Sequence, residues 1–66
     1  MPSTAIEWAA WKNGVMSVKY QGGEAYDYLD VPEWVYREFR SAPSKGRFVN
    51  FVIKPNYEYR KRPDLH

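Results

Sequence analysis

The sequence predicts a small α+β domain: a three-stranded antiparallel meander followed by two short helices packed on one face, in the order β-β-β-α-α. Asn13-Gly14 is a strong hairpin signal, because both central residues of a type I′ turn need positive φ. Residues 15–20 alternate apolar and polar side chains, as a half-buried strand does. Pro43 and Pro55 each follow a helical pattern and are expected to end it.

The three strands are predicted over residues 5–11, 15–20 and 24–29. The loop between the second and third strands leaves two registers open. If it is a two-residue turn, Tyr26 and Tyr28 form an exposed aromatic platform of the kind that stacks bases of single-stranded RNA.

If that loop has three residues, with Gly23 left-handed in a bulge, both tyrosines join the apolar face under the helices. Val18 would then oppose Tyr26, and Met16 would oppose Tyr28. We favour this second register because it gathers the four apolar side chains on one side of the sheet.

The first helix is expected to begin at Pro32, which suits a first helical position because it has no amide hydrogen to satisfy. Asp30 is placed to cap this helix from just outside it. Val35 and Phe39 lie at helical spacing on one apolar face, and Pro43 ends the helix.

Ser44 is placed to cap a second, shorter helix over roughly residues 47–54, which Pro55 terminates. Beyond it the chain has little apolar content and is expected to fray or stay disordered. The sequence therefore predicts one domain over residues 1–57 and a flexible basic carboxy-terminal tail over residues 58–66.

Two runs of turn, aromatic and basic residues cover most of the chain. They are Tyr20-x-x-Gly23-x-x-Tyr26-x-Tyr28-x-x-Val31-Pro32-x-x-Val35-Tyr36 and Ala42-x-Ser44-Lys45-Gly46-Arg47-Phe48-x-Asn50-x-x-Ile53-x-x-x-Tyr57. The combined pattern, which runs from about Ser3 to Arg60, resembles the KTSC domain. That family is named after a carboxy-terminal appendage of some lysyl-tRNA synthetases and also occurs as free-standing small bacterial and phage proteins.

The resemblance implies a small module for which RNA binding has been suggested, and it brings no catalytic site. The chain departs from the family in three places. Its first hairpin loop is shorter, Phe51 and Val52 stand at helix positions that are often polar, and Pro55 interrupts a segment that is basic elsewhere. The last two departures favour an apolar contact face over a continuous basic one.

Charge is unevenly distributed along the 66 residues. The first half carries two lysines against five acidic residues, −3, and the second half carries eight basic residues against three acidic ones, +5. This asymmetry favours an anionic partner for the second half, although ordinary solvated charge would look the same. The absence of cysteine, of a signal-peptide pattern and of a membrane-length apolar run predicts a cytoplasmic protein with no membrane partner.

Basic and polar residues of the second helix and tail are the candidate contacts to RNA or another polyanion. Backbone amides beside two cations at residues 44–47 suit a phosphate, although a capped helix start has the same composition. Cations interleaved with aromatics near the end of the chain suit nucleic acid, and a solubilising terminus would share them. The predicted nucleic-acid-binding residues are Lys45, Arg47, Asn50, Lys54, Tyr57, Arg60, Lys61 and Arg62.

The alternative function is a protein–protein interaction module, a phage-type accessory protein that docks on a host protein or self-associates. Trp8 and Trp11 have opposite parity, so a regular strand cannot bury both on one face. Trp8 is therefore expected to be exposed unless a bulge intervenes or Trp34 covers it. The predicted partner interface is Trp8, Phe51 and Val52.

No catalytic constellation is recognisable in the sequence. His66, the only histidine, is the last residue, and the serines have no neighbouring base to activate them. Asp27, Asp30 and Asp64 have no metal-ligand spacing. The sequence therefore predicts a protein that is not an enzyme, with no catalytic residues, no metal and no cofactor.

Overall fold

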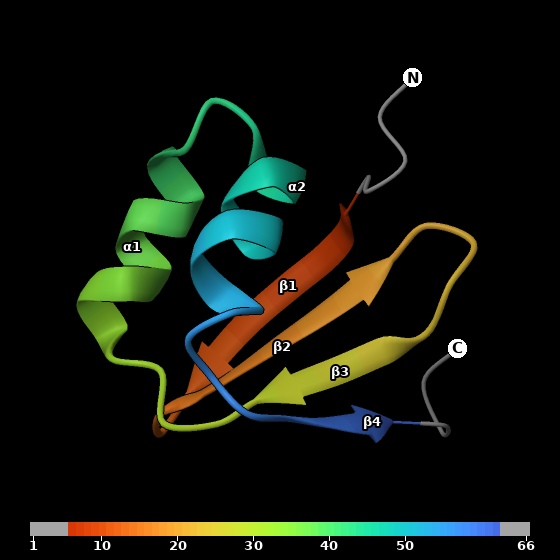
Figure 1. Ribbon diagram of the computed structural model, residues 1–66, viewed down its shortest axis with the longest axis horizontal. Coiled ribbons are helices and arrows are strands. Elements are labelled where there is room, and N and C mark those ends of the chain that lie inside the picture. Colours follow the sequence, from red (N-terminus) through yellow and green to blue (C-terminus); the bar gives the residue numbers. More distant parts are fainter. Residues whose placement is uncertain (1–5, 63–66) are drawn as a thin grey trace.

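The computed structural model describes residues 6–62 as a four-stranded antiparallel sheet with helices on one face (Figure 1). The strands lie in the order β1-β2-β3-β4. The elements are β1 Ile6–Lys12, β2 Val15–Tyr20, β3 Ala25–Tyr28, α1 Glu33–Ser41, α2 Lys45–Phe48, the π-helical turn η1 Val49–Ile53, and β4 Tyr59–Arg62. The predicted α+β class and the order of its first five elements are confirmed.

The β1–β2 hairpin closes as its turn residues predict. Asn13 has φ 52° and Gly14 has φ 84°, the two positive values that a type I′ turn needs.

Within β1, a register shift lies between Ile6, which is paired with Tyr20, and Trp8, which is paired with Lys19. This bulge places Ile6 on the apolar face and leaves Trp8 on the opposite one.

The β2–β3 pairing has the favoured register, with Val18 opposite Tyr26 and Met16 opposite Tyr28. The prediction that Gly23 is left-handed is wrong, because Gly22 carries the positive φ of 71°. The Gly23 amide donates to the Tyr20 carbonyl at 3.1 Å and so closes a four-residue turn, whose third position is Gly22. At Gly23 a side chain would crowd Tyr20, since an added Cβ would lie 3.3 Å from its Cβ.

Asp30 does not cap α1. Pro32 is the N-cap residue, α1 begins one residue later than predicted, and no side chain bonds to its first amides. Asp30 is instead left-handed, with φ 57°, a conformation that aspartate tolerates better than most residues. The turn is held by Val31, whose amide donates to the Gly14 carbonyl and whose carbonyl accepts from the Trp11 indole, both at 2.8 Å.

Ser44 caps the second helical segment as predicted, and its Oγ accepts from the Arg47 amide at 3.3 Å. The helix begins at Lys45, two residues earlier than predicted, because a cap at Ser44 makes the next residue the first helical one. Its second half widens into η1, where the Lys54 amide donates to the Val49 carbonyl at 2.8 Å.

The prediction of a frayed segment after Tyr57 is wrong for Tyr59–Arg62, which forms β4 against β3. Pairing with β2 leaves the other edge of β3 open, and backbone pairing there does not require apolar side chains. The Leu29 amide extends the pairing by donating to the Glu58 carbonyl at 2.8 Å. The rest of the predicted tail, residues 63–66, lies outside the described residues.

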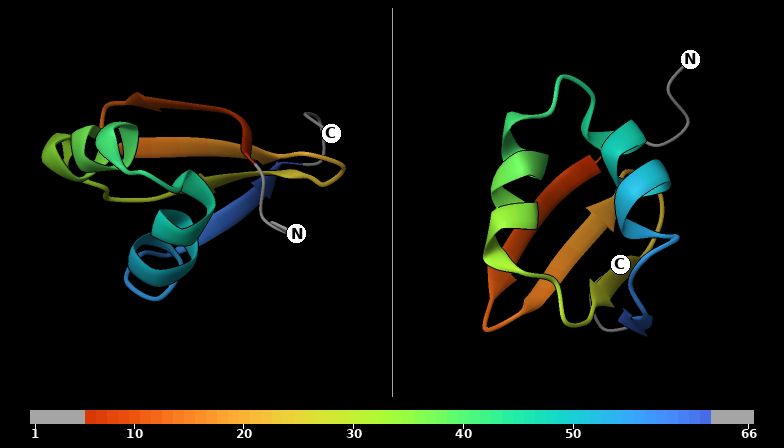
Figure 2. Two further views of the ribbon diagram at one scale, coloured as in Figure 1. Left: turned by 90° about the horizontal axis from the view of Figure 1, so that it is seen from above. Right: turned by 60° about the vertical axis from the view of Figure 1, so that its left-hand side comes forward.

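The core lies between the sheet and the helical segments, while no helix within residues 6–62 covers the other sheet face (Figure 2). Its members come from β2, β3, the turn before α1, and the helices: Met16, Val18, Tyr28, Val31, Val35, Phe39, Val49 and Ile53. In this part of the chain no helix has the length and apolar character to cross a bilayer.

Candidate nucleic-acid interface

A cavity of about 460 Å³ opens between the β2–β3 loop, β4 and the residue that follows η1. Its volume falls in the range typical of small-molecule sites. We call it the tyrosine pocket, and it is lined by Tyr20, Gln21, Gly23, Glu24, Tyr26, Tyr28, Lys54 and Tyr59.

Four tyrosine rings form the apolar part of this pocket. Tyr26 meets Tyr20 and Tyr59 edge to face, with ring centroids 5.7 Å and 5.4 Å apart, and Tyr28 lies 5.9 Å from Tyr59. Tyr28 is buried, whereas Tyr59 is 58% exposed at the rim. Tyr59 therefore offers a ring held by its neighbours and open to an incoming flat ligand.

Two of the pocket hydroxyls, those of Tyr20 and Tyr28, are neutral at physiological pH. Tyr20 and Tyr28 share a hydrogen bond of 3.0 Å between their hydroxyl oxygens. Burial raises the pKa of both phenols above the ordinary value of 10.0, and the shift is larger for Tyr28. These two groups therefore bond to one another and place no negative charge in the pocket.

Two lysines flank the pocket. The Lys54 ammonium lies 5.4 Å from the centroid of the Tyr20 ring, within the range of a cation–π contact. Lys61 lies opposite Tyr26 on β4, and its Nζ is 2.9 Å from Glu24 Oε1. The hydrogen bond to Glu24 raises the pKa of Lys61, so this cation remains charged beside the aromatic rings.

Lys45 and Arg47, from the same predicted set, lie elsewhere, at the α1–α2 connection. The Lys45 ammonium donates to the carbonyls of Arg40 at 3.1 Å and Ala42 at 3.4 Å. It thereby satisfies carbonyls at the end of α1, as cations near a helix C-terminus commonly do. Arg47 is exposed on the first turn of α2.

Arg60 and Arg62 point to the sheet face that no helix covers, because they lie opposite Asp27 and Ala25 rather than the core-facing tyrosines. Arg62 pairs with Asp27 at 3.1 Å, and Asp27 also accepts from the Ser17 hydroxyl at 2.7 Å. These arginines therefore lie on the other side of the sheet from the tyrosine pocket.

Asn50 and Tyr57 are half-buried, and Tyr57 packs against the core. Of the eight predicted contacts, the structure thus brings only Lys54 and Lys61 to the tyrosine pocket. Sequence reasoning missed Glu24 and Tyr59 as members of a site. If residues 59–62 are recognised as a strand, alternation places Tyr59 and Lys61 on one face and the two arginines on the other. This alternation was the available signal for the site.

The predicted partner interface does not form one surface. Trp8 is 38% exposed on the face without helices, whereas Phe51 is 73% exposed on η1, on the helix side. Val52 is half-buried and packs against the core. Trp34 does not cover Trp8, since it stands on α1 beside Phe48.

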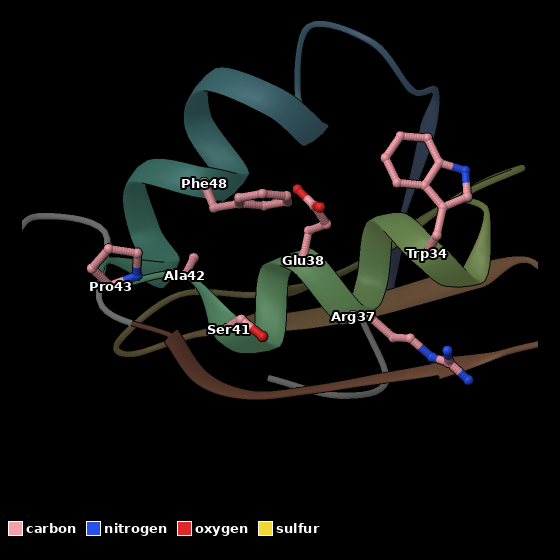
Figure 3. A pocket seen from close by; sticks show the side chains of 7 residues that line it. All are labelled: Trp34, Arg37, Glu38, Ser41, Ala42, Pro43 and Phe48. Carbon is pink, nitrogen blue, oxygen red and sulfur yellow. The ribbon is translucent and has the colours of Figure 1, made fainter.

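A second hollow, of about 610 Å³, runs along α1 towards α2 (Figure 3). Trp34 and Phe48 form its apolar walls, and Trp34 is 65% exposed. The Glu38 side chain lies between the two rings, while Arg37 points away from them (Figure 3). With one acidic and one basic side chain in its lining, this groove offers no basic surface to a polyanion.

Within residues 6–62 no group of three or more histidine, cysteine, aspartate or glutamate side chains is arranged to hold a metal ion. The geometry defines a small sheet-and-helix domain with an aromatic, lysine-flanked pocket at one end of its sheet.

The sequence profile of the KTSC domain matches residues 2–57, and the chain belongs to this family. A crystal structure of a KTSC domain protein from Yersinia pestis superposes with a TM-score of 0.83 at 33% identity, covering 94% of this chain and 93% of that one.

Two curated relatives are similar to the chain over different shares of their own length. A protein of Tsukamurella paurometabola is 37% identical over 57 residues, which cover 83% of this chain and 85% of the relative. A lysine–tRNA ligase of Nostoc punctiforme is 31% identical over 48 residues, 73% of this chain but only 9% of the ligase. The domain is therefore similar both to nearly all of a small protein and to a short segment of a large enzyme.

Proposed function

We propose that this KTSC domain is a non-enzymatic module that binds single-stranded RNA, with an unpaired base in the tyrosine pocket and phosphates on Lys54 and Lys61. The observation that carries the proposal is the position of the exposed Tyr59 ring in one cavity with Lys54 and next to Lys61. Proteins that bind single strands combine aromatic rings for stacking with cations that follow the backbone.

The ring-lined pocket favours an unpaired base, turned out of the strand, over a base within a duplex. Bases in an RNA helix are stacked and paired, so a ring-lined cavity is accessible only to an unpaired nucleotide. Stacking on an aromatic side chain contributes about 1–3 kcal/mol per base. The two lysines add a contribution that weakens as salt rises, because binding releases counterions from the phosphates.

The lysine–tRNA ligase of Nostoc punctiforme supports the choice of RNA, since its name describes an enzyme that acts on tRNA. The similarity covers a small part of that enzyme. For this chain, tRNA is one of the single-stranded-loop RNAs to be tried as a ligand.

Fluorescence anisotropy with a labelled single-stranded RNA, titrated at about 50 mM and about 200 mM salt, tests the proposal. Replacing both Lys54 and Lys61 by Gln should weaken binding and lower the slope of log affinity against log salt by about 0.7 per lysine. The matched control removes the same charge from exposed Arg40 and Arg47, away from the pocket, and should leave that slope unchanged. Absence of binding, or an affinity indifferent to salt, would contradict the proposal.

A second candidate function, docking on a protein, is favoured by the groove of Figure 3. Its exposed Trp34 ring and the Glu38 carboxylate suit an arginine or lysine presented by a partner. A blocked arginine-containing peptide should then shift the Trp34 indole resonance in an NMR titration, and the Glu38→Gln variant should reduce that shift. An unchanged resonance would remove this candidate.

A further inference from the structure

We propose that the tyrosine pocket distinguishes among bases and that the Glu24 carboxylate makes it prefer guanine. This inference rests on the proposed RNA binding and assigns one residue the role of reading the base. Glu24 supplies the one carboxylate among the described residues that line the pocket.

The structure holds Glu24 in place from two sides. Its carbonyl accepts from the Tyr20 amide at 3.5 Å, at the point where the β2–β3 loop closes. Its carboxylate is bonded to Lys61 at 2.9 Å through Oε1, and its side chain is 37% exposed. The carboxylate is therefore both oriented and accessible from the cavity.

An ionised carboxylate only accepts hydrogen bonds, and its two oxygens offer about four lone-pair sites. Lys61 occupies one of these sites, so Glu24 can still accept two hydrogen bonds from a ligand. The other polar groups of the pocket do not favour one base in this way. A tyrosine hydroxyl both donates and accepts, the Tyr20 and Tyr28 hydroxyls already bond one another, and the Lys54 ammonium only donates. The exposed Gln21 amide both donates and accepts, and so favours no base.

Guanine complements this arrangement better than the other bases. Its unpaired Watson–Crick edge carries the N1–H and N2–H₂ donors side by side, which match the two oxygens of a carboxylate as a bidentate pair. Adenine and cytosine each present one amino group beside an acceptor nitrogen, and uracil presents one N–H between two carbonyls. An acceptor nitrogen or carbonyl facing Glu24 would be repelled.

The inference can be tested with four labelled heptanucleotides, UUUNUUU, that differ only in the central base. The guanine form should bind most tightly, by roughly 5- to 160-fold over the others, the discrimination of one good bidentate pair. Glu24→Gln should abolish most of this preference, because an amide has a single acceptor oxygen. Glu24→Asp keeps the charge but shortens the reach, and should reduce the preference. Thermal unfolding of each variant shows that the domain remains folded.

The matched control is Glu58→Gln, which removes an exposed carboxylate next to β4 but outside the pocket and should leave the guanine preference intact. Salt-dependent binding of all four RNAs with equal affinity would overturn the guanine inference while leaving the proposed RNA binding in place. A guanine preference that persists in both folded Glu24 variants would overturn it equally. If none of the four RNAs binds, both the inference and the proposed function fail.

Discussion

Replacing Tyr59 by Ala should separate RNA binding from folding, because this ring lies at the rim of the tyrosine pocket and is 58% exposed. A fully buried aromatic side chain covers about 150–250 Å², so folding buries roughly 60–105 Å² of Tyr59. At about 25 cal/mol per Å² this corresponds to an upper limit of about 1.5–2.5 kcal/mol of stability. A domain of this size is expected to have about 3–10 kcal/mol, so the variant should remain folded.

The folded variant should also bind RNA more weakly. Removal of one stacked ring costs about 1–3 kcal/mol per base, which corresponds to an affinity roughly 5- to 160-fold weaker. Anisotropy titration with single-stranded RNA measures this change, and circular dichroism during heating checks the fold.

Phe51→Ala is the matched control, since Phe51 is 73% exposed on η1 and does not line the pocket. The control should bind RNA as the unmodified domain does. The reasoning is refuted if the folded Tyr59 variant keeps its affinity, or if the Phe51 variant loses as much.

Three further predictions concern the fold that supports the pocket. Burial raises the pKa of Tyr28, so its contribution to stability is complete below the unfolded value of 10.0 and is lost as pH rises above it. Denaturation at about pH 8 and about pH 11 should show this fall, and Tyr28→Phe should make it smaller. Trp11→Phe should lower the free energy of unfolding by about 1–3 kcal/mol in urea titrations, because it leaves the buried Val31 carbonyl without its donor. Ser44→Ala should lower it by about 0.5–2 kcal/mol in the same assay, and an unchanged value would contradict the observed cap.

Local signals were sufficient to predict most of the sheet and helix order. Asn13-Gly14 needs only its own backbone preference to specify the first turn. The register that buries Tyr28 and half-buries Tyr26 followed because one alternative placed four apolar side chains together. Ser44 could be recognised as a cap because its role depends on residues three positions away.

The features that could not be predicted depend on distant partners. Tyr59–Arg62 has no apolar alternation, and it pairs because β3 offers an open edge and because Tyr59 packs on Tyr26. The tyrosine pocket draws its lining from segments spread between residues 20 and 59. Its composition follows from the position of β4, a segment whose sequence alone predicts a tail. A tail would keep Arg60, Lys61 and Arg62 together as one basic group. In a strand, side chains alternate between the two faces of the sheet, so Lys61 lies on the opposite face from the two arginines.

The most direct test of the account is a two-dimensional amide NMR titration of the whole chain with the unlabelled heptanucleotide UUUGUUU. The account predicts that the largest chemical-shift changes cluster at Tyr20, Glu24, Tyr59 and Lys61, around the tyrosine pocket. Changes centred instead on the α1–α2 groove or on the sheet face of Arg60 and Arg62 would contradict it, as would a spectrum that does not change.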